Sequence, residues 1–417
     1  MLKNLKSDAF KILNEAIESV LPENAVLETL KSLKLHDEKI VLVAIGKAAW
    51  RMAKAAKEFL GERIKKGIVI TKYAHNAGPI DDLIICEAGH PIPDENSIKA
   101  TEMALKLVEN LSKNDIVLFL ISGGGSALFE KPKGNVTLEQ LQKITEQLLK
   151  SGANIVEINT IRKHLSEVKG GRFAEKVYPA KVVCLILSDV LGDRLDSIAS
   201  GPAYPDETTS EDAINIIRKY GIEVDENLLN ELMEETPKSL ENAEHYIIGS
   251  VKTVCIKAEE IAKKLGYNTM ILTTTLDCEA REAGRFIASI AREEKSNSLP
   301  LKKPCAIIMG GETVVHVTGN GKGGRNQELA LSAAEGIAGL EDVVICSVGT
   351  DGTDGPTDAA GGIVDGKTLE KLSKAGIDLD EVLKNNDSYN ALKTVEGLIF
   401  TGPTGTNVND LIFLLVS

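Results

Sequence analysis

The sequence lacks the features that would mark a membrane-spanning, secreted or nucleic-acid-binding protein. None of its apolar runs approaches the roughly 20 residues that a membrane-spanning helix needs. Residues 1–21 are amphipathic but have neither the apolar centre nor the cleavage site of a signal peptide, so we expect a surface helix of a cytoplasmic protein. The formal net charge of −13 argues against nucleic acid and anionic membranes as partners, because both repel an acidic surface.

Cysteine clusters, sequence repeats and a P-loop are also missing. The six cysteines are scattered singly, without CxxC or Cys/His spacing, which argues against a zinc site and a disulfide framework. We therefore interpret them as small buried hydrophobic side chains in a reducing compartment. No segment matches GxxxxGK[ST], and the chain has no internal repeat or low-complexity stretch.

The length and the apolar pattern predict two α/β domains. At 417 residues the chain is too long for one ordinary core. Apolar runs typical of buried strands alternate with segments of helical periodicity, which predicts parallel sheets with crossover helices. The predicted strands are Ile40–Ile45, Gly67–Thr71, Leu83–Glu87, Ile116–Ile121, Val182–Leu187, Tyr246–Ile248, Thr269–Thr273, Cys305–Met309, Val314–Thr318, Val343–Val348 and Leu411–Val416. The predicted helices include Ala48–Leu60, Ser97–Leu111, Leu138–Lys150, Val251–Leu265, Glu279–Glu293 and Asn326–Ala338.

A domain boundary is predicted after the acidic helical stretch Asp225–Glu235, just before a new strand begins. This gives an N-terminal domain of residues 1–238 and a C-terminal domain of residues 239–417. Ligands of such folds bind at the carboxyl ends of the strands, so we expect a cleft between the two domains to hold the site.

A basic, glycine-rich segment, GNGKGGR, occupies residues 319–325 between an apolar run and an amphipathic stretch. Glycine lets backbone amides turn towards an anion, and the N-terminus of a following helix adds partial positive charge. Lys322 and Arg325 add full charges, and a guanidinium can hold an oxyanion through two hydrogen bonds. The segment therefore predicts a site for a phosphate or a carboxylate.

Small, polar or acidic residues follow five of the predicted strands, where an open α/β sheet binds its ligands. These loops read GKAAW (46–50), SGGGSAL (122–128), SDVLGDRLDSIASGP (188–202), GGET (310–313) and GTDGTDGPTDAAGG (349–362). Within Ser122–Ser126 no side chain exceeds a hydroxymethyl group, so a ligand can reach the backbone amides. Lys47 directly follows a buried strand, and its ammonium lies either in this crevice or, as a snorkelling side chain, at the surface.

Basic and acidic side chains gather near these loops. The segment NTIRKHLSEVKGGR (159–172) places Arg162 with Ser166, and Lys169 with Arg172, on shared faces of a helix, either as a solvated surface or beside a phosphate. Acidic residues also follow the strands and either cap loops or hold Mg²⁺ against a polyphosphate. They are Asp189, Asp193, Asp196, Glu312, Asp351, Asp354 and Asp358. A last polar loop, GPTGTNVND (402–410), offers Thr404, Thr406 and Asn407 to a ligand or forms a structured turn.

Residues 319–324 also match the dinucleotide-binding pattern GxGxxG, which leaves nicotinamide binding open. That pattern should be followed about 20 residues later by an acid at the end of the next strand. Asp351 comes 27 residues after Gly324, which is late. Lysine and arginine within the turn also suit free charged phosphate better than a neutralised pyrophosphate.

Together these motifs closely resemble the glycerate 2-kinase family, a bacterial and animal family with a C-terminal MOFRL domain whose members were often labelled hydroxypyruvate reductases. The resemblance rests on GKA at Gly46, SGGGSAL at Ser122, SDVLGD and IASGP from Ser188, GGE at Gly310, GKGGRNQE at Gly321, GTDGTDGPTDAAG at Gly349 and GPTGTNVND at Gly402. It covers nearly the whole chain. It implies phosphorylation of D-glycerate by ATP and Mg²⁺ at the 2-hydroxyl, in a cleft between a larger Rossmann-like N-terminal domain and a smaller MOFRL domain.

Lys47 and Arg325 match the family's invariant basic positions, and we expect them to neutralise the transferring phosphate and the glycerate carboxylate. We expect Asp189 to accept or orient the substrate hydroxyl proton, and Asp351 with Asp193 or Glu312 to hold Mg²⁺. The expected phosphate-binding residues are Ser122, Gly123, Gly124, Gly125, Ser126, Lys322, Gly323 and Gly324. The expected substrate-binding residues are Arg162, Asn326, Thr404 and Asn407.

Two other functions stay open from the sequence. An NAD(P)H-dependent hydroxypyruvate reductase would transfer a hydride without ATP, and a sugar-acid sensor would bind glycerate without turnover. Both a monomer and a homodimer are compatible with the sequence.

Overall fold

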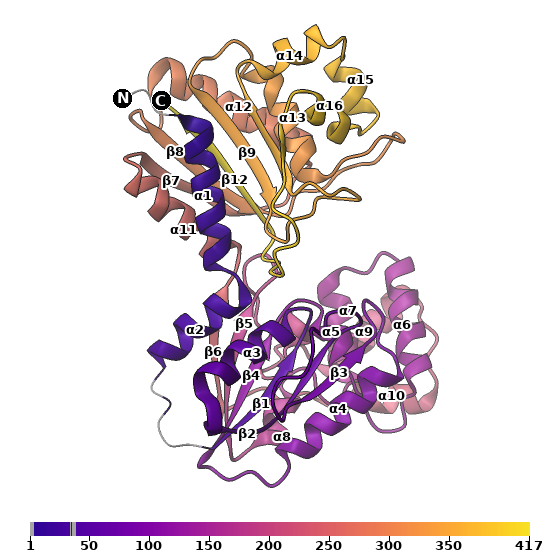
Figure 1. Cartoon of the computed structure of the whole chain (residues 1–417). Helices are drawn as coiled ribbons and strands as arrows, with labels where there is room; N and C mark the ends of the chain where they lie inside the picture. The colour runs from indigo at the N-terminus through magenta and orange to yellow at the C-terminus, as the bar shows by residue number, and fades with distance from the viewer. Residues whose placement is uncertain (1–3, 34, 36–38) are drawn as a thin grey trace. The chain divides into compact units, whose positions relative to one another are not determined.

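The computed structural model describes residues 4–33, 35 and 39–417, and the chain divides into two compact units. The N-terminal unit is Pro22–Ile248, and the C-terminal unit joins Met1–Leu21 to Gly249–Ser417. Figure 1 shows the elements of each unit. Both units contain a sheet of six strands among the described residues, so the expected pair of α/β domains is confirmed.

The sheet of the N-terminal unit has the strand order of the Rossmann fold, β3-β2-β1-β4-β5-β6. Its strands are β1 (Lys39–Ile45), β2 (Ile64–Lys72), β3 (Ile84–Ala88), β4 (Asp115–Ile121), β5 (Lys181–Leu187) and β6 (Ala243–Gly249). The pairs β1–β2, β1–β4, β2–β3 and β4–β5 are parallel. Since parallel strands end at the same edge, the loops after β1, β4 and β5 are neighbours.

Helices cover both faces of this sheet. Those packed on it are α2 (Pro22–Ser32), α3 (Ala49–Leu60), α4 (Glu95–Val108), α5 (Gly125–Leu128) and α8 (Arg172–Val177), with 3₁₀ turns at Gly61–Arg63 and Ile198–Ser200. The other helices of this unit, α6 (Leu138–Lys150), α7 (Ile155–His164), α9 (Ser210–Tyr220) and α10 (Glu226–Met233), pack on one another around a separate core cluster. Along β1, Val41, Val43 and Ile45 pack into one core cluster, whereas Leu42 and Ala44 pack into another on the opposite face. This explains why the strands are continuous apolar runs.

The sheet of the C-terminal unit is mixed, in the order β11-β10-β9-β12-β8-β7. Its strands are β7 (Asn268–Leu276), β8 (Cys305–Gly311), β9 (Val343–Gly349), β10 (Gly361–Asp365), β11 (Leu398–Ile399) and β12 (Asp410–Val416). The closing strand β12 lies between β8 and β9 and is antiparallel to both. The expectation of a second parallel sheet is therefore wrong. A buried strand reads as a continuous apolar run in either direction, so periodicity could not reveal the reversal.

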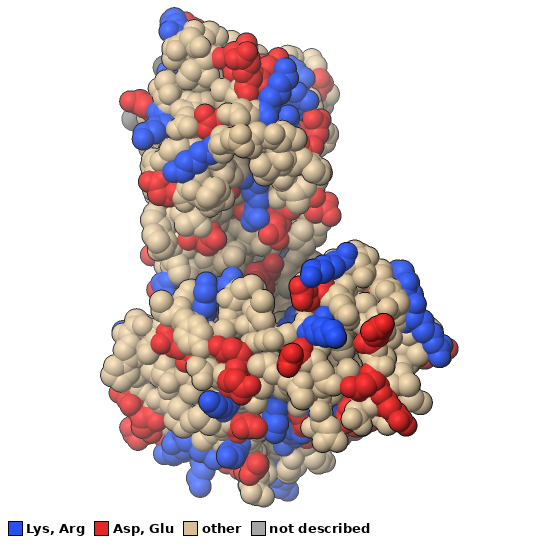
Figure 2. All heavy atoms as spheres, turned by 90° about the vertical axis from the view of Figure 1, so that its right-hand side faces the viewer, with Lys and Arg blue, Asp and Glu red and all other residues tan. Residues whose placement is uncertain are grey.

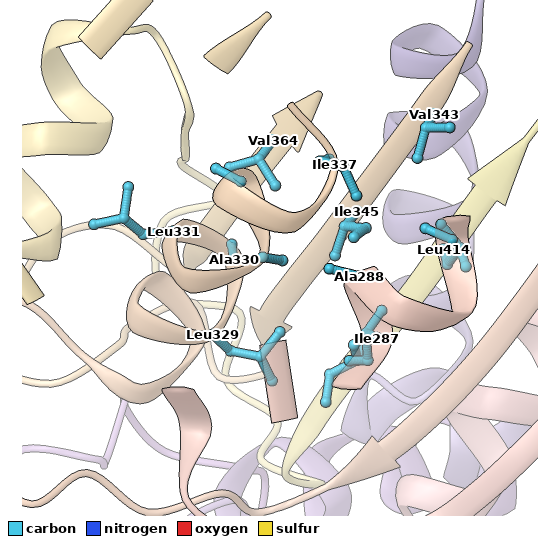
Figure 3. Packing of buried hydrophobic residues seen from close by; sticks show 14 of the residues in the cluster. Ile287, Ala288, Leu329, Ala330, Leu331, Ile337, Val343, Ile345, Val364 and Leu414 are labelled. Atoms are coloured by element: carbon cyan, nitrogen blue, oxygen red, sulfur yellow. The ribbon is translucent and has the colours of Figure 1, made fainter. Parts of the chain in front are cut away.

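Helices and an apolar core complete the C-terminal unit. The helices are α1 (Leu5–Ser19), α11 (Val251–Lys264), α12 (Ala280–Asn297), α13 (Arg325–Gly336), α14 (Thr368–Lys374), α15 (Leu379–Lys384) and α16 (Ser388–Thr394). Figure 3 shows Leu329 of α13 and Ile287 of α12 close to Ile345 of β9, and all three belong to one core cluster. A Cβ at Gly284 of α12 would lie 2.0 Å from Ser332 Oγ of α13, so only glycine permits this close helix packing.

The compact units differ from the predicted domains of residues 1–238 and 239–417 at both ends. Strand β6 extends the N-terminal sheet beside β5, which moves the division from residue 238 to residue 248. Helix α1 belongs to the C-terminal unit, where it packs on α11 and where Tyr267 donates a hydrogen bond of 2.7 Å to Asp8. The expected N-terminal helix therefore exists, but its apolar face is buried in the C-terminal unit; residues 1–3 lie outside the described residues.

The predicted strand Val314–Thr318 is also wrong, because only Val314 forms an isolated bridge, to Glu279. Val317 is 75% exposed, and the backbone of Thr318 donates to the side chain of Asn386 instead of to a neighbouring strand. The segment before Gly319 is therefore an extended loop.

Charged side chains of both signs share the surface. On the face drawn in Figure 2, lysine and arginine are interspersed with aspartate and glutamate. Within the described ranges, no helix has both the length and the apolar character required to cross a bilayer. Four of the six cysteines are buried as expected, whereas Cys86 is partly exposed and Cys278 is exposed.

Candidate active site

In the N-terminal unit, the loops after β1 and β4 are bound to each other. The backbone N–H of Lys47 donates to the carbonyl of Gly123 over 2.9 Å, and Ser122 Oγ accepts from the N–H of Ala48 over 3.0 Å. A Cβ at Gly46 would lie 2.2 Å from Ser122 Oγ, so this approach depends on glycine. The structure thus brings Lys47 to the segment Ser122–Ser126, which we call the glycine loop.

Asp189, which follows β5, lies against the glycine loop. A Cβ on Gly123 would come within 2.2 Å of Asp189 Oδ2, and one on Gly124 would come within 3.3 Å of Lys47 Cγ. Gly124 has a φ of 86°, a left-handed conformation that favours glycine. Three predicted site features, the Lys47 residue, the small-residue loop and the Asp189 carboxylate, therefore come together at one edge of one sheet.

Ser126, at the end of the glycine loop, is held by Arg162 and Ser200, and Ser200 is held in turn by Asn159. The guanidinium of Arg162 donates to the Ser126 carbonyl over 2.9 Å, and Ser126 Oγ lies 3.0 Å from Ser200 Oγ. Ser200 Oγ donates to Asn159 Oδ1 over 3.2 Å. Ser200 and its neighbour Ala199 both have positive φ, 60° and 50°, an arrangement that costs free energy and is found most often at functional sites.

The basic segment 159–172 is neither one helix nor a solvated surface. Helix α7 ends at His164, so the expected shared helical faces do not form. Lys169 and Glu130 are both fully buried and pair over 2.9 Å, and Lys163 pairs with buried Asp206 over 3.1 Å. Burial lowers the pKa of Lys169 to about 8, although the charge of Glu130 opposes this. Both ammonium groups are therefore held in buried ion pairs, and that of Lys169 also donates to the carbonyl of Phe129, three residues after the glycine loop, over 2.8 Å.

Asp193, expected at a metal, also follows β5. Its Oδ1 is buried and has no hydrogen-bond partner within the part of the chain that the structure describes. Its φ is 54°. No three Asp, Glu, His or Cys side chains among the described residues gather as a ready set of metal ligands.

In the C-terminal unit, Arg325 begins α13 and is held by two carboxylates. Its Nε and one terminal nitrogen donate to both oxygens of Asp410, over 2.6 and 3.0 Å, and its other terminal nitrogen donates to Glu312 over 2.9 Å. Burial would lower the pKa of Arg325, but the hydrogen bond and charge of Asp410 raise it above its usual range. The guanidinium is therefore fixed and charged, with about a third of its side chain exposed.

A buried polar network supports this arginine. Asn326, 1% exposed, donates from Nδ2 to Asp410 over 3.0 Å and accepts from Ser347 Oγ over 2.6 Å. Asp354 accepts from the backbone N–H groups of Asn326 and Gln327, at the N-terminus of α13. These contacts favour a positioning role for Asn326 over direct contact with substrate. Burial raises the pKa of Asp410 to about 6, although Arg325 opposes this.

The first four residues of the segment Gly319–Gly324 do not form an open anion loop. Its amides from Gly319 to Lys322 all donate to acceptors in Asn385–Asp387, over 2.8–3.0 Å. Only Gly323 and Gly324, within the described ranges, keep amides without such an acceptor. The exposed Lys322 places its ammonium 4.3 Å from the ring centre of Tyr389. Because no strand precedes the segment, GxGxxG lacks the context of a dinucleotide site.

The remaining predicted residues lie on two touching loops after β9 and before β12. Thr404 donates from its N–H to the Asp351 carbonyl over 3.2 Å and from Oγ1 to the Thr350 carbonyl over 2.6 Å. Asp351 Oδ1 accepts from the N–H of Thr353, and Asn407 Oδ1 accepts from the N–H of Asn409. The structured-turn interpretation of this loop is thus supported, and the amide nitrogen of the exposed Asn407 donates to no residue that the structure describes.

Comparison with known proteins places the chain in a family. A family model described as a domain of unknown function (DUF4147) matches residues 8–233, and the MOFRL family model matches residues 305–410. The D-glycerate 2-kinase of Thermotoga maritima is 63% identical over 99% of both chains, and the glycerate 2-kinase of Pyrococcus horikoshii is 44% identical over 99% of this chain and 98% of its own. The crystal structure of the Thermotoga glycerate kinase superposes with a TM-score of 0.97 over 99% of both chains.

This chain belongs to the glycerate 2-kinase family with a MOFRL domain.

Several residues of this glycerate 2-kinase family member were not predicted as site residues, although they lie inside motifs that the sequence displays. Asn159 opens NTIRKHL, Ser200 belongs to IASGP, and Asp410 ends GPTGTNVND. Glu130 lies two residues after SGGGSAL. Each holds a predicted residue or its support in place, and pairings across such sequence distances are decided only by the fold.

Proposed function

We propose that this protein is a D-glycerate 2-kinase that transfers the terminal phosphoryl group of ATP to the 2-hydroxyl of D-glycerate. Full-length similarity to the Thermotoga D-glycerate 2-kinase carries the proposal. The cluster of Lys47, the glycine loop and Asp189 supports it, because phosphoryl transfer depends on positioning and on charge neutralisation. Both proposed substrates are metabolites of the cytoplasm, so we also propose that location.

In the N-terminal unit, the ammonium of Lys47 neutralises a phosphate that contacts the glycine-loop amides. The carboxylate of Asp189, beside Gly123, accepts or orients the proton of the substrate hydroxyl. Arg162 keeps its bond to Ser126, which orients the loop. We propose that its remaining nitrogens bind glycerate.

In the C-terminal unit, Arg325 supplies the second fixed cation. We propose that Lys47 and Arg325 act on the same reaction in a cleft between the two domains. Lys322, Gly323 and Gly324 then contact the nucleotide phosphates, and Thr404 and Asn407 contact substrate hydroxyls. The two hydrogen bonds from Arg325 to Asp410 support this role. They fix the orientation of the guanidinium, so little reorganisation is needed when it binds an oxyanion.

The carboxylates present fit a magnesium ion that enters with the nucleotide. Mg²⁺ keeps several waters and takes only one or two protein carboxylates beside the phosphates, so a ready cluster of three is not needed. The buried Asp193 Oδ1 without a partner suits such a ligand, and we propose Asp193 with Asp351 for this role. Glu312 suits it less, because it already pairs with Arg325. When bound, Mg²⁺ neutralises charge on the phosphates.

Phosphorus NMR of the products tests the proposal directly. The full chain is incubated with D-glycerate, ATP and Mg²⁺, and we expect 2-phosphoglycerate, resolved from 3-phosphoglycerate by its own signal. Lys47→Ala and Arg325→Ala should each lower kcat by roughly a hundredfold or more, as expected for groups that stabilise transferring charge. Lys143→Ala and Arg218→Ala, at exposed positions on α6 and α9, serve as controls and should match the wild type.

The same purified protein also distinguishes a kinase from a reductase. A hydroxypyruvate reductase would oxidise NADH with hydroxypyruvate in the absence of ATP. NADH oxidation without any ATP-dependent product would overturn the kinase proposal. Binding of glycerate with neither reaction would instead indicate a sensor.

A further inference from the structure

His90, which follows β3, lies over the same glycine as the side chain of Lys47. A Cβ built on Gly124 would lie 2.9 Å from His90 Cδ2 and 3.1 Å from Nε2, beside the 3.3 Å approach to Lys47 Cγ. A side chain at position 124 would therefore displace the imidazole. The left-handed Gly124 thus makes room for a histidine directly on the glycine loop.

Among the described residues, the imidazole of His90 has no hydrogen-bond partner, unlike the rings of His75, His164 and His245. Ring nitrogens of His75, His164 and His245 lie 2.8–3.0 Å from backbone carbonyls. Neither ring nitrogen of His90 hydrogen-bonds to any described residue, although the ring is partly buried. A partly buried donor without an acceptor is costly unless a ligand or water supplies one.

The charges around His90 are mainly positive. Lys47, Lys72 and His75 face the ring. Of the nearby acids, Asp94 is already bonded to Tyr73 and Ser97. Asp189 lies at Gly123, on the adjoining part of the glycine loop. Burial and these cations lower the pKa of His90 to about 4, so at neutral pH its ring is uncharged and carries one N–H donor.

We propose that His90 is a further anion-binding residue of this site, donating a ring N–H to the oxyanion that Lys47 neutralises. The oxyanion is a nucleotide phosphate or the glycerate carboxylate. Which of them it is rests on the proposed function, whereas the binding of an oxyanion does not. A neutral donor beside a lysine adds direction to the attraction without adding charge.

Sulfate tests this inference without any turnover, because it is an oxyanion that does not titrate near neutral pH. Histidine is labelled with ¹³C, and its ring C–H signals are followed between pH 4 and 8 with and without sulfate. The His90 signal, identified by its loss in His90→Gln, should move on addition of sulfate. Its titration midpoint should also rise, because the bound anion offsets the neighbouring cations. His316, an exposed histidine of the C-terminal unit, should show no comparable shift.

Kinetics with both substrates then distinguish the two sources of the oxyanion. A hydrogen bond to a charged group corresponds to roughly a ten- to hundredfold change in affinity, so His90→Ala should raise one KM by that factor. A rise in the KM for ATP assigns the phosphate, and a rise in the KM for D-glycerate assigns the carboxylate. His90→Gln, which keeps an N–H donor, should recover part of the loss, whereas His316→Gln should leave both constants unchanged.

The proposal is overturned by a His90 signal that neither sulfate nor ATP moves, or by wild-type KM values for both substrates in folded His90→Ala. Absence of kinase activity in the wild type with a sulfate-dependent His90 shift would overturn the proposed function alone.

Discussion

Replacing Lys169 with methionine should destabilise the N-terminal unit strongly, because it leaves the carboxylate of Glu130 buried without its counter-ion. Both side chains are fully buried and 2.9 Å apart. The ammonium also donates to the carbonyl of Phe129 over 2.8 Å, and Ser166 Oγ donates to Glu130 over 2.6 Å. Lys169→Met removes the first two interactions and keeps only the third.

The expected loss is about 3 kcal/mol, the lower end of the range for breaking a buried ion pair from one side. The lower end applies because the charge of Arg162 also lies near Glu130. For a unit of this size, each kcal/mol corresponds to about 2–4 °C in the midpoint of thermal unfolding. Lys169→Met with Glu130→Gln removes both charges and keeps an acceptor for Ser166, so we expect this double variant to recover most of the loss.

Fluorescence of the only tryptophan reports on this unit alone. Trp50 belongs to α3, and its indole N–H donates to the carbonyl of Gly78 over 2.8 Å. Urea titrations of the wild type, both single variants and the double variant complete a double-mutant cycle, whose coupling term isolates the pair. If Lys169→Met costs less than about 1 kcal/mol, or if the double variant is no more stable than the single one, the ion pair does not stabilise the N-terminal unit in this way.

Three further outcomes follow from the same contacts. Burial raises the pKa of Asp410 from 3.8 to about 6. Between these two pH values the folded state binds more protons than the unfolded state does. The stability that this group contributes is therefore fully present below pH 3.8 and is lost as the pH rises through about 6. Asp410→Asn should remove this pH dependence of the unfolding free energy, which amounts to up to about 3 kcal/mol. Urea titrations at pH 4 and 6.5, followed by circular dichroism, measure it, and identical profiles for the variant and the wild type would contradict this prediction. Ser200→Ala removes the bonds to Ser126 and Asn159 and should lower kcat/KM for ATP by about tenfold with only a small change in unfolding midpoint; unchanged kinetics would show that the loop needs no such support. Gly124→Ala adds a Cβ within 2.9 Å of His90 in a left-handed residue and should reduce kcat/KM by roughly a hundredfold, whereas Gly152→Ala, at a left-handed position with free space, should only cost about 1–2 kcal/mol of stability.

The sequence predicted the buried strands well, and the parallel arrangement that it predicted is correct for the paired strands β1 to β5 of the N-terminal sheet but wrong for most pairs of the C-terminal sheet. Continuous apolar runs gave eleven predicted strands, and ten of them lie within or largely overlap strands of the structure. Val314–Thr318 failed because β-branched residues in an exposed loop give the same pattern as a short strand. The short strands β10 and β11 were missed, since GGIVD and LI are too brief or too rich in glycine to stand out.

Part of the candidate site could also be predicted, where all the residues follow strands of one parallel sheet. Lys47, the glycine loop and Asp189 come after β1, β4 and β5, and adjacency of those strands brings them together. The basic segment 159–172 was harder, because a lysine paired with a buried carboxylate 39 residues away looks in the sequence like any other surface lysine. Loop amides of Gly319–Lys322 posed the same difficulty, since their acceptors lie more than 60 residues further along the chain.

The sequence by itself determined that this chain forms two α/β units with small, polar and charged residues after the strands, because apolar periodicity and glycine placement are local properties. Only the tertiary structure decided the partners. In the folded chain α1 belongs to the C-terminal unit, and β12 lies antiparallel between β8 and β9. Lys169 forms a buried ion pair with Glu130, and Arg325 forms an ion pair with Asp410. Those choices depend on burial and charge pairing between residues far apart in the chain, which no local pattern encodes.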